Sequence, residues 1–191
     1  MNDSLKNLSP LDGRYQNKTE KSRELFSEFA LIKQRIRVEI HWLNYFLTNF
    51  KPELLTEKTQ EKIITLCTTV PDSLIERVKE IENITNHDVK AVELAVAEQF
   101  EESEEIQSLV HIFLTSEDIN SLSYALMLKN AQPILLNWIE NIIKALEVLA
   151  EKNKEVAMLA RTHGQPASPT TLGKELNVFA VSYTHLTLPT K

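Results

Sequence analysis

Four short polar segments carry the residues of this sequence that are best suited to chemistry. They comprise residues 12–15, 85–88, 115–118 and 161–165, and each combines hydroxyl or amide groups with a charged side chain or an imidazole. Each segment also adjoins the end of a predicted helix. Because the first turn of a helix leaves backbone N–H groups without partners, such breaks can bind anions. The sequence therefore predicts that loops between helices bind a small anionic ligand.

His163 is singled out by the glycines that surround it. The whole chain has three glycines, Gly13, Gly164 and Gly173, and two of them lie within residues 161–175. Glycine is required where the backbone takes a positive φ or where another group approaches closely. An imidazole can transfer a proton near neutral pH, so this stretch could shape a catalytic site. A histidine beside glycine and proline is also typical of an exposed loop, and this alternative stays open.

Two of the other segments can be explained by helix capping alone. His87 precedes Asp88 at a predicted helix start, where such residues are often caps. Thr115 and Asp118 match the capping box, in which a Ser or Thr is followed three residues later by an acidic side chain. Three further histidines lie in or near apolar runs without a recognisable motif, and no role is assigned to them: His41, His111 and His185.

Composition limits the class of protein. With 191 residues, of which 42% are apolar and 25% charged, the chain can bury a sizeable core. Its net charge of −6 argues against a general nucleic-acid binder, but not against an anionic small molecule. The single cysteine, Cys67, excludes an internal disulfide and has apolar neighbours, so we expect it to be buried. We expect a cytoplasmic protein, because the first ten residues do not resemble a signal peptide and no apolar run could span a membrane.

No pattern in the sequence predicts a metal or a cofactor. A zinc site would need a His-Glu-x-x-His helix, paired cysteines or closely spaced histidines and carboxylates, and the sequence has none of these. The Gly-x-Gly-x-x-Gly and P-loop sequences of nucleotide-binding folds do not occur either. The acidic residues 101–105 are predicted to form a solvated connection. We therefore expect a site that works without metal or cofactor.

The spacing of apolar residues predicts an all-α fold. Residues 19–50 carry one apolar stripe at intervals of three and four, which indicates a single helix: Leu25, Phe29, Ile32, Ile36, Ile40, Leu43 and Leu47. Shorter helices are predicted over residues 57–70, from Asp72 or Ser73 to a break at residues 83–88, over residues 89–100, and from residue 106. A long helix then runs from residue 115 to about residue 155, with Pro133 marking a kink or a joint. Its second half is nearly a heptad, as in a long bundle: Leu135, Ile139, Ile142, Leu146 and Leu149.

No segment alternates with period two for long enough to predict a strand. Residues 161–168 are therefore expected to form a loop, followed by a helix that begins at Pro169 or Thr170. Residues 1–107 would form a small helical N-terminal domain, and residues 108–181 the first helices of an elongated bundle. Residues 182–191 are rich in Ser and Thr and contain Pro189, so we expect the last helix to end at Val181. A truncated or wrongly joined gene would explain such a tail.

Taken together, the four segments reveal a resemblance to a known family. The sequence resembles the adenylosuccinate lyase family, within the fumarase/aspartase superfamily, from about Leu8 to about Val181. The matching stretches, in order, are SPLDGRY at 9–15, TNHDVKAVE at 85–93, TSEDIN at 115–120 and RTHGQPA at 161–167. A Thr-His element in the last position is shared across the superfamily, so the other three stretches are the ones that indicate this family.

The resemblance implies a carbon–nitrogen lyase acting in purine nucleotide biosynthesis. Such an enzyme releases fumarate from adenylosuccinate, which gives AMP, and from the earlier succinylocarboxamide ribotide. A base removes the proton next to a carboxylate, and hydrogen bonds and positive charge stabilise the resulting anion. On this resemblance His163 is the general acid that protonates the departing nitrogen. The residues implied in substrate binding are Arg14, Tyr15, Asn86, His87, Asp88, Thr115, Ser116 and Thr162.

The resemblance also divides the substrate among these residues. Arg14 and Tyr15 would contact the nucleotide phosphate, and Thr115 and Ser116 would donate to the succinyl carboxylate. His87 would lie near the phosphate or orient the acid. Two further cations could add positive charge or could be ordinary solvated side chains: Lys90 and Arg161.

The family's base is a serine in a mobile loop of the type Ser-Ser-x-Met-Pro-x-Lys-x-Asn, which this sequence does not contain. We therefore expect the 191-residue chain to be inactive alone. The family's enzymes are homotetramers whose sites combine several subunits, and neither nucleic acid nor a membrane is an expected partner. Two alternatives remain open: another fumarate-releasing lyase, such as argininosuccinate lyase or a fumarase, and a non-catalytic helical scaffold.

Overall fold

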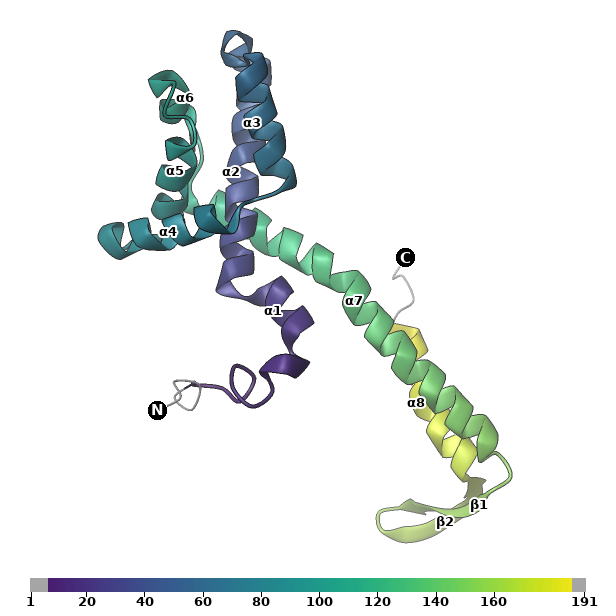
Figure 1. The fold of residues 1–191 in the computed structure, drawn as a ribbon. Helices are drawn as coiled ribbons and strands as arrows, with labels where there is room; N and C mark the ends of the chain where they lie inside the picture. The colour runs from purple at the N-terminus through teal and green to yellow at the C-terminus, as the bar shows by residue number, and fades with distance from the viewer. Residues whose placement is uncertain (1–6, 187–191) are drawn as a thin grey trace. The chain divides into compact units, whose positions relative to one another are not determined.

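The computed structural model of the chain describes residues 7–186 and consists mainly of helices (Figure 1). This confirms the predicted helical fold class, with one small sheet added. The chain divides into two units, one ending at Asn130 and the other beginning at Ala131, and each is described by itself. The domain boundary expected after residue 107 stays a prediction.

Helix α2 (Glu28–Phe50) supplies the central face of the first unit's core. Five residues of its predicted apolar stripe are fully or almost fully buried: Ile32, Ile36, Ile40, Leu43 and Leu47. The single helix predicted over residues 19–50 is wrong at one point, because the chain breaks at Ser27 between α1 (Glu20–Phe26) and α2. The Ser27 hydroxyl accepts a hydrogen bond from the Ala30 N–H at 3.2 Å and caps α2. Phe29, which belongs to the predicted stripe, is exposed.

Four shorter helices complete the first unit's core with α2. They are α3 (Glu57–Thr68), which lies alongside α2 in Figure 1, α4 (Asp72–Thr85), α5 (Asp88–Glu98) and α6 (Glu104–Leu109). The buried core between them includes Ile63, Leu74, Val78, Val92, Val96 and Phe100.

The boundaries of α4 differ from the prediction. Neither Asp72 nor Ser73 caps this helix, because Pro71 already occupies the cap position with its extended backbone. The helix also continues to Thr85, so the predicted break at residues 83–88 is reduced to Asn86 and His87. Cys67, near the end of α3, is only half-buried against the core and forms no disulfide.

Helix α7 (Ser116–Lys152) begins in the first unit and continues into the second. Pro133 lies inside this helix, close to the division between the units, and its missing N–H removes one bond of the helical ladder. The second unit also contains β1 (Ala157–Thr162), β2 (Gln165–Thr171) and α8 (Leu172–Leu186). Within residues 7–186, no helix is both long enough and apolar enough to cross a bilayer.

The loop predicted at residues 161–168 is wrong, because β1 and β2 form an antiparallel hairpin. Thr162 pairs with Gln165, which leaves His163 and Gly164 as the two residues of the turn. The φ angle is 50° at His163 and 75° at Gly164. Positive φ at both central residues is the mark of a type I′ turn, whose twist matches that of a hairpin. Most side chains of both strands are exposed. The strands therefore need no alternation of apolar and polar residues, and the sequence has no such pattern from which they could be predicted.

A bulge interrupts the register of this hairpin. Leu159 pairs with Pro169 and Arg161 with Pro166, so β2 places two residues opposite Ala160. Proline is compatible with β2 because, within the described residues, the sheet has only two strands and both of its edges are open. A bulge of this kind increases the local twist and can redirect the end of a hairpin.

The last helix extends further than predicted. Its expected end at Val181 is wrong, because α8 continues to Leu186. Residues 182–186 contain neither proline nor glycine, so nothing in them forces the helix to stop. The Ser182 hydroxyl donates to the Val178 carbonyl at 2.8 Å, so this polar side chain finds a hydrogen-bond partner within the helix. The part of the predicted tail at residues 187–191 lies outside the described residues.

Gly173 lets the start of α8 approach the end of α7. Its N–H donates to the Asn153 carbonyl at 3.0 Å. A Cβ at this position would lie 2.7 Å from the backbone of Lys154 and would collide with the carbonyl oxygen of Ala150. Backbone atoms cannot move aside as a flexible side chain can, so only glycine fits here.

Replacement of Gly173 by alanine is expected to destabilise the second unit by about 1–3 kcal/mol, as overpacking does. Gly164→Ala should cost about 1–2 kcal/mol for a different reason, since the φ angle alone is unfavourable there and open space surrounds the position. Urea unfolding followed by circular dichroism measures both changes. Asn177→Ala, at an exposed position of α8, is the control and should change little. A Gly173→Ala protein as stable as the parent would contradict the close approach.

Candidate functional site

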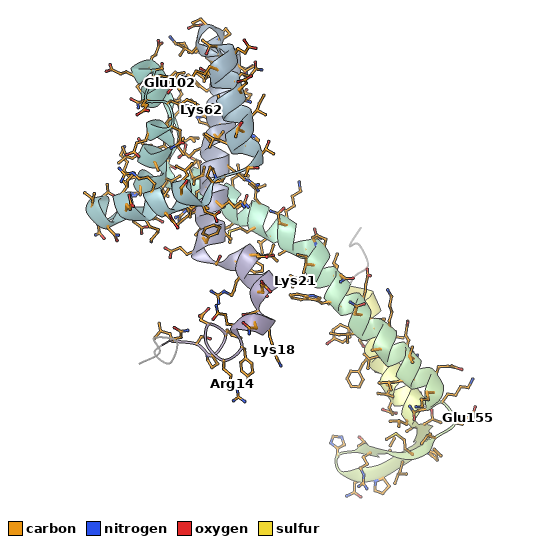
Figure 2. All side chains as sticks on the ribbon, viewed as in Figure 1. Arg14, Lys18, Lys21, Lys62, Glu102 and Glu155 are labelled. Carbon is orange, nitrogen blue, oxygen red and sulfur yellow. The ribbon has the colours of Figure 1, made fainter. Side chains whose placement is uncertain are left out.

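The first polar segment lies in a turn ahead of α1. The turn is closed by the Tyr15 N–H, which donates to the Pro10 carbonyl at 2.9 Å. Arg14 and Tyr15 are both exposed, and the guanidinium carbon of Arg14 lies 5.5 Å from the centre of the Tyr15 ring. Lys18 Nζ lies 6.0 Å from the same ring. Figure 2 shows Arg14, Lys18 and Lys21 along this stretch of chain. Cations beside a phenol form a surface that suits a phosphate group.

The second segment is the connection between α4 and α5. Asn86 takes the left-handed conformation, with φ of 52°, and its N–H donates to the Glu82 carbonyl at 2.8 Å to end α4. His87 begins α5, because its Nδ1 accepts a hydrogen bond from the Lys90 N–H at 3.1 Å. The proton of a neutral imidazole is then on Nε2, which faces away from this bond. The exposed His87 ring can therefore cap the helix and still donate a hydrogen bond to an anion.

The third segment forms only one half of the predicted capping box at the start of α7, because the Asp118 N–H donates to the Thr115 carbonyl and not to the Thr115 hydroxyl. The Asp118 carboxylate accepts the Thr115 backbone N–H at 2.7 Å and the Thr115 hydroxyl at 2.8 Å. These two bonds lower the pKa of Asp118 below its ordinary value. Because the Thr115 hydroxyl already donates to Asp118, its proton is not directed at an external anion. Ser116, the first residue of α7, lies beside it and is half-buried.

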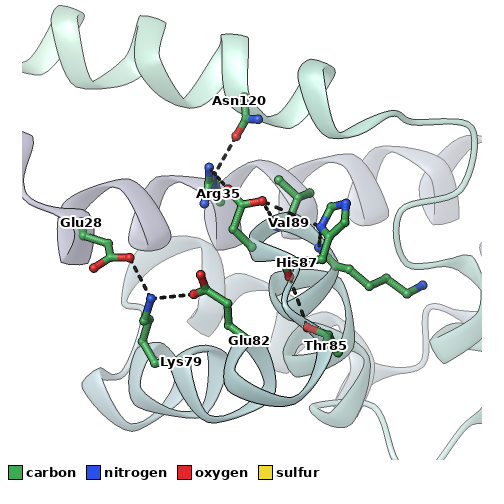
Figure 3. Close-up of polar contacts among 10 residues, drawn as sticks. Glu28, Arg35, Lys79, Glu82, Thr85, His87, Val89 and Asn120 are labelled. Atoms are coloured by element: carbon green, nitrogen blue, oxygen red, sulfur yellow. Dashed lines mark hydrogen bonds and ion pairs between the residues drawn. The ribbon is translucent and has the colours of Figure 1, made fainter.

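Arg35 joins the second segment to α7 (Figure 3). One guanidinium nitrogen lies 2.6 Å from Asp88 Oδ2, and Nε donates to Asn120 Oδ1 at 2.9 Å. The other oxygen of Asp88 accepts the Val89 N–H at 2.8 Å. Partial burial acts to raise the pKa of Asp88, but the Val89 N–H and the Arg35 charge outweigh it, and the pKa lies below its ordinary value. Sequence reasoning missed Arg35, although its place beside the apolar stripe of α2 was a signal that it faces the interior.

Glu39, one turn after Arg35 on α2, is fully buried against His111. Its Oε1 lies 2.6 Å from His111 Nδ1, while Oε2 has no hydrogen-bond partner in the described part of the chain. Burial raises the pKa of Glu39, although His111 opposes the shift. His111 and Phe113 both have positive φ, 63° and 62°, in the connection from α6 to α7. Such backbone is strained for these residues.

The indole of Trp42 also holds this connection, since its Nε1 donates to the Ile112 carbonyl at 2.8 Å. Two side chains of α2, Glu39 and Trp42, therefore fix the backbone that leads to Thr115. No role could be assigned to His111 from the sequence, because no local pattern shows that it pairs with a residue 72 positions away.

The fourth segment lies at the tip of the hairpin in the second unit. His163 and Thr162 are both exposed, and the backbone hydrogen bonds of the two strands hold the turn in place. An imidazole presented in this way can reach a ligand and exchange a proton with it. Arg161 is exposed on β1, and Lys90 Nζ of the second segment lies 2.6 Å from Glu93.

The structure thus links only some of the predicted site residues. Arg35 connects Asp88 with the first turns of α7, which carry Thr115 and Ser116 at their start. Thr162 and His163 belong to the second unit. In the described residues, no group of three or more His, Cys, Asp or Glu side chains could hold a metal ion. The arrangement offers hydroxyl, amide, imidazole and cationic groups, which can bind carboxylates and phosphates and transfer protons.

We expect the difference in the free energy of unfolding between Glu39→Gln and the parent to depend on pH. A raised pKa means that the folded protein holds this proton more tightly than the unfolded chain does. The carboxyl group therefore lowers the free energy of unfolding as the pH rises from its ordinary pKa of 4.5 through the folded value. Glutamine keeps an oxygen for His111 Nδ1–H and cannot ionise. The urea midpoint of the Glu39→Gln protein, relative to that of the parent, should therefore rise from pH 4 to pH 7.

Glu39→Leu is the matched variant for this prediction, because it removes both the charge and the acceptor for His111. It should be less stable than Glu39→Gln at every pH, since a buried donor is left unpaired. A difference between the Gln variant and the parent that stays constant with pH would contradict the raised pKa.

Comparisons with known proteins agree on one family. The sequence profile of the family described as lyase matches residues 13–187. The chain is 45% identical over 180 residues to an adenylosuccinate lyase of Legionella pneumophila, strain Corby, covering 91% of this chain and 40% of that protein. Adenylosuccinate lyases of Haemophilus influenzae and Escherichia coli K12 are 43% and 40% identical, with the same coverage. The chain thus spans about 40% of the length of these curated relatives.

Solved structures agree on the fold. A fumarate lyase from Mesorhizobium sp. BNC1 is similar with a TM-score of 0.70 and 22% identity, over 87% of this chain and 38% of that one. The β-carboxy-cis,cis-muconate cycloisomerase of Acinetobacter calcoaceticus is similar with a TM-score of 0.66 and 20% identity, over the same shares of the two chains. Because the family profile covers residues 13–187, nearly all of the sequence, the chain belongs to the lyase family.

Proposed function

We propose that this chain is part of an adenylosuccinate lyase, which cleaves adenylosuccinate to AMP and fumarate and also cleaves succinylocarboxamide ribotide in purine nucleotide biosynthesis. The observation that carries the proposal is the 40–45% identity to relatives that bear this name. The enzyme would be an amidine-lyase of the cytoplasm that needs no cofactor.

His163 would be the general acid of this reaction. When the carbon–nitrogen bond breaks, its electron pair goes to the departing nitrogen, which takes a proton from the imidazole. The family's serine base, on the loop that this sequence does not contain, would take the proton from the carbon next to the carboxylate, and the electrons of that carbon–hydrogen bond would form the double bond of fumarate. The turn supports this role, because it exposes the imidazole on a backbone that the two strands hold. Thr162, the last residue of β1, would bind substrate beside it.

The residues of the first unit would bind the two anionic ends of the substrate. Arg14 and Tyr15 would receive the phosphate, since a guanidinium offers a fork of donors to phosphate oxygens. His87 would donate from Nε2, while Asn86 and Asp88 hold it in place at the start of α5.

Ser116 and Thr115 would bind the succinyl carboxylate at the N-terminus of α7, where unpaired N–H groups favour an anion. The bond from the Thr115 hydroxyl to Asp118 leaves Ser116 as the readier donor. Arg161 and Lys90 would contribute positive charge, with Lys90 partly neutralised by Glu93.

A homotetramer is the proposed assembly of the enzyme. Large apolar side chains on the second half of α7 support this, because they are exposed in the single chain: Leu135, Leu136, Trp138, Ile142, Val148 and Leu149. Three of them belong to the near-heptad pattern of the sequence. Exposed apolar rows of this extent are typical of surfaces that other helices cover.

The role of His163 can be tested in a chimera, in which the aligned residues of this chain replace their counterparts in the Legionella pneumophila enzyme. Fumarate release from adenylosuccinate is expected in the chimera, and His163→Ala should lower kcat by about 10²- to 10⁴-fold, the usual contribution of a general acid. His41→Ala, which removes an exposed histidine of α2, is the control and should retain activity. An active His163→Ala chimera would refute the assignment, and release of fumarate from argininosuccinate or malate instead would refute the substrate.

The 191-residue chain alone is expected to release no fumarate from adenylosuccinate. The reason is that the sequence contains no Ser-Ser-x-Met-Pro-x-Lys-x-Asn loop, which in this family carries the serine base. A coupled assay of fumarate with the purified chain, beside the chimera at the same concentration, measures the difference. Turnover by the chain alone would show that its own residues supply the base.

A further inference from the structure

We propose that Arg35 is a positioning residue that couples the two substrate-binding segments of the first unit, residues 85–88 and 115–118. This inference rests on the proposed function for the meaning of those segments, but its geometry is independent of it. Arg35 is buried, with 6% of its surface exposed, and in the described residues it bonds to no hydroxyl group of either segment. It acts through Asp88 and Asn120.

The contacts of Arg35 join three helices at one point. Arg35 lies on α2, Asp88 is the first residue of α5, and Asn120 lies in the second turn of α7. Asp88 directly follows His87, and Asn120 lies on the same helix as Ser116, one turn further along. The position of one guanidinium therefore fixes where both helix starts lie relative to α2 (Figure 3).

The surroundings make these contacts hard to replace. A small apolar cluster of Val38, Val89 and Ile119 lies between the same three helices, and all three side chains are buried. A buried guanidinium in such a place depends on protein acceptors rather than on water. The lowered pKa of Asp88 agrees with this, because the Val89 N–H and the Arg35 charge outweigh the effect of its burial.

Arginine is suited to this task because its nitrogens point in fixed, different directions. Nε donates to Asn120 while a terminal nitrogen reaches Asp88. A lysine carries the same charge on a single flexible nitrogen, so it can keep the pair with Asp88 but cannot hold both partners in one plane. Arg35→Lys should therefore loosen both helix starts, because one flexible nitrogen cannot hold Asp88 and Asn120 in fixed positions at the same time.

The first test measures the coupling in the chain itself, without any ligand. Hydrogen exchange is followed at the N–H groups of Lys90 and Thr115, which are bonded to His87 and Asp118. In Arg35→Lys both should exchange about tenfold faster, the equivalent of one charge-assisted hydrogen bond. Arg37→Lys is the matched control, because Arg37 lies on the same helix and, among the described residues, donates only to the Thr68 carbonyl. Faster exchange at one site alone, or at neither, would overturn the coupling.

The second test separates positioning from simple structural support, and uses the active chimera. Groups that bind the ground state and the transition state alike affect KM rather than kcat. Asn120→Leu, which removes one of the two contacts, should therefore raise KM for adenylosuccinate about tenfold and leave kcat nearly unchanged. Asn120→Asp keeps an oxygen for Arg35 Nε and should restore the parental KM. An unchanged KM in Asn120→Leu, or no rescue in Asn120→Asp, would overturn the inference.

The two proposals fail in different ways. If the parent chimera releases no fumarate, the proposed function fails, and the exchange measurement still decides whether Arg35 couples the segments. If the chimera is active and the Asn120 variants behave like their parent, the proposed function stands and the role of Arg35 is refuted.

Discussion

A guanidinium that is buried must be met by acceptors, and this requirement organises the first unit. Arg35 lies on the most central helix, and its two acceptors, Asp88 on α5 and Asn120 on α7, lie 53 and 85 residues further along the chain. Satisfying the charge therefore places the start of α5 and the first turns of α7 at fixed positions on α2. Apolar packing alone would allow these helix ends to slide, since contacts among Val, Ile and Leu have little directionality.

Glu39 places a second constraint on the same face of α2, one turn away. Its bond to His111, together with the bond from Trp42 to Ile112, holds a connection whose backbone is strained at two residues. A buried carboxyl group with one oxygen that has no partner in the described part of the chain does not favour stability. Both polar residues thus define the positions of helix ends, while the apolar stripe beside them supplies the free energy of folding. The apolar residues of α2 therefore stabilise the unit, and its buried polar residues orient the helices around it.

Features that depend on neighbouring residues could be predicted from the sequence, and features that depend on distant partners could not. The buried stripe from Ile32 to Leu47 and the pairing of Thr115 with Asp118 are local patterns, and both are present. The break at Ser27 was missed because the apolar period continues across it. The hairpin was missed because its exposed strands carry no alternation. The partners of Arg35 and Glu39 lie on other helices, so no spacing rule could reveal them.

The two prolines of β2 have a consequence for the solubility of the chain. In the described structure, the hairpin that carries His163 has no third strand, so both of its outer edges are open to other extended chains. Pro166 and Pro169 offer no N–H, and the bulge opposite Ala160 breaks the regular spacing of the remaining groups. Such an edge is a poor template for edge-to-edge aggregation. The β2 edge of the hairpin that displays this exposed imidazole is thus guarded against the addition of another strand.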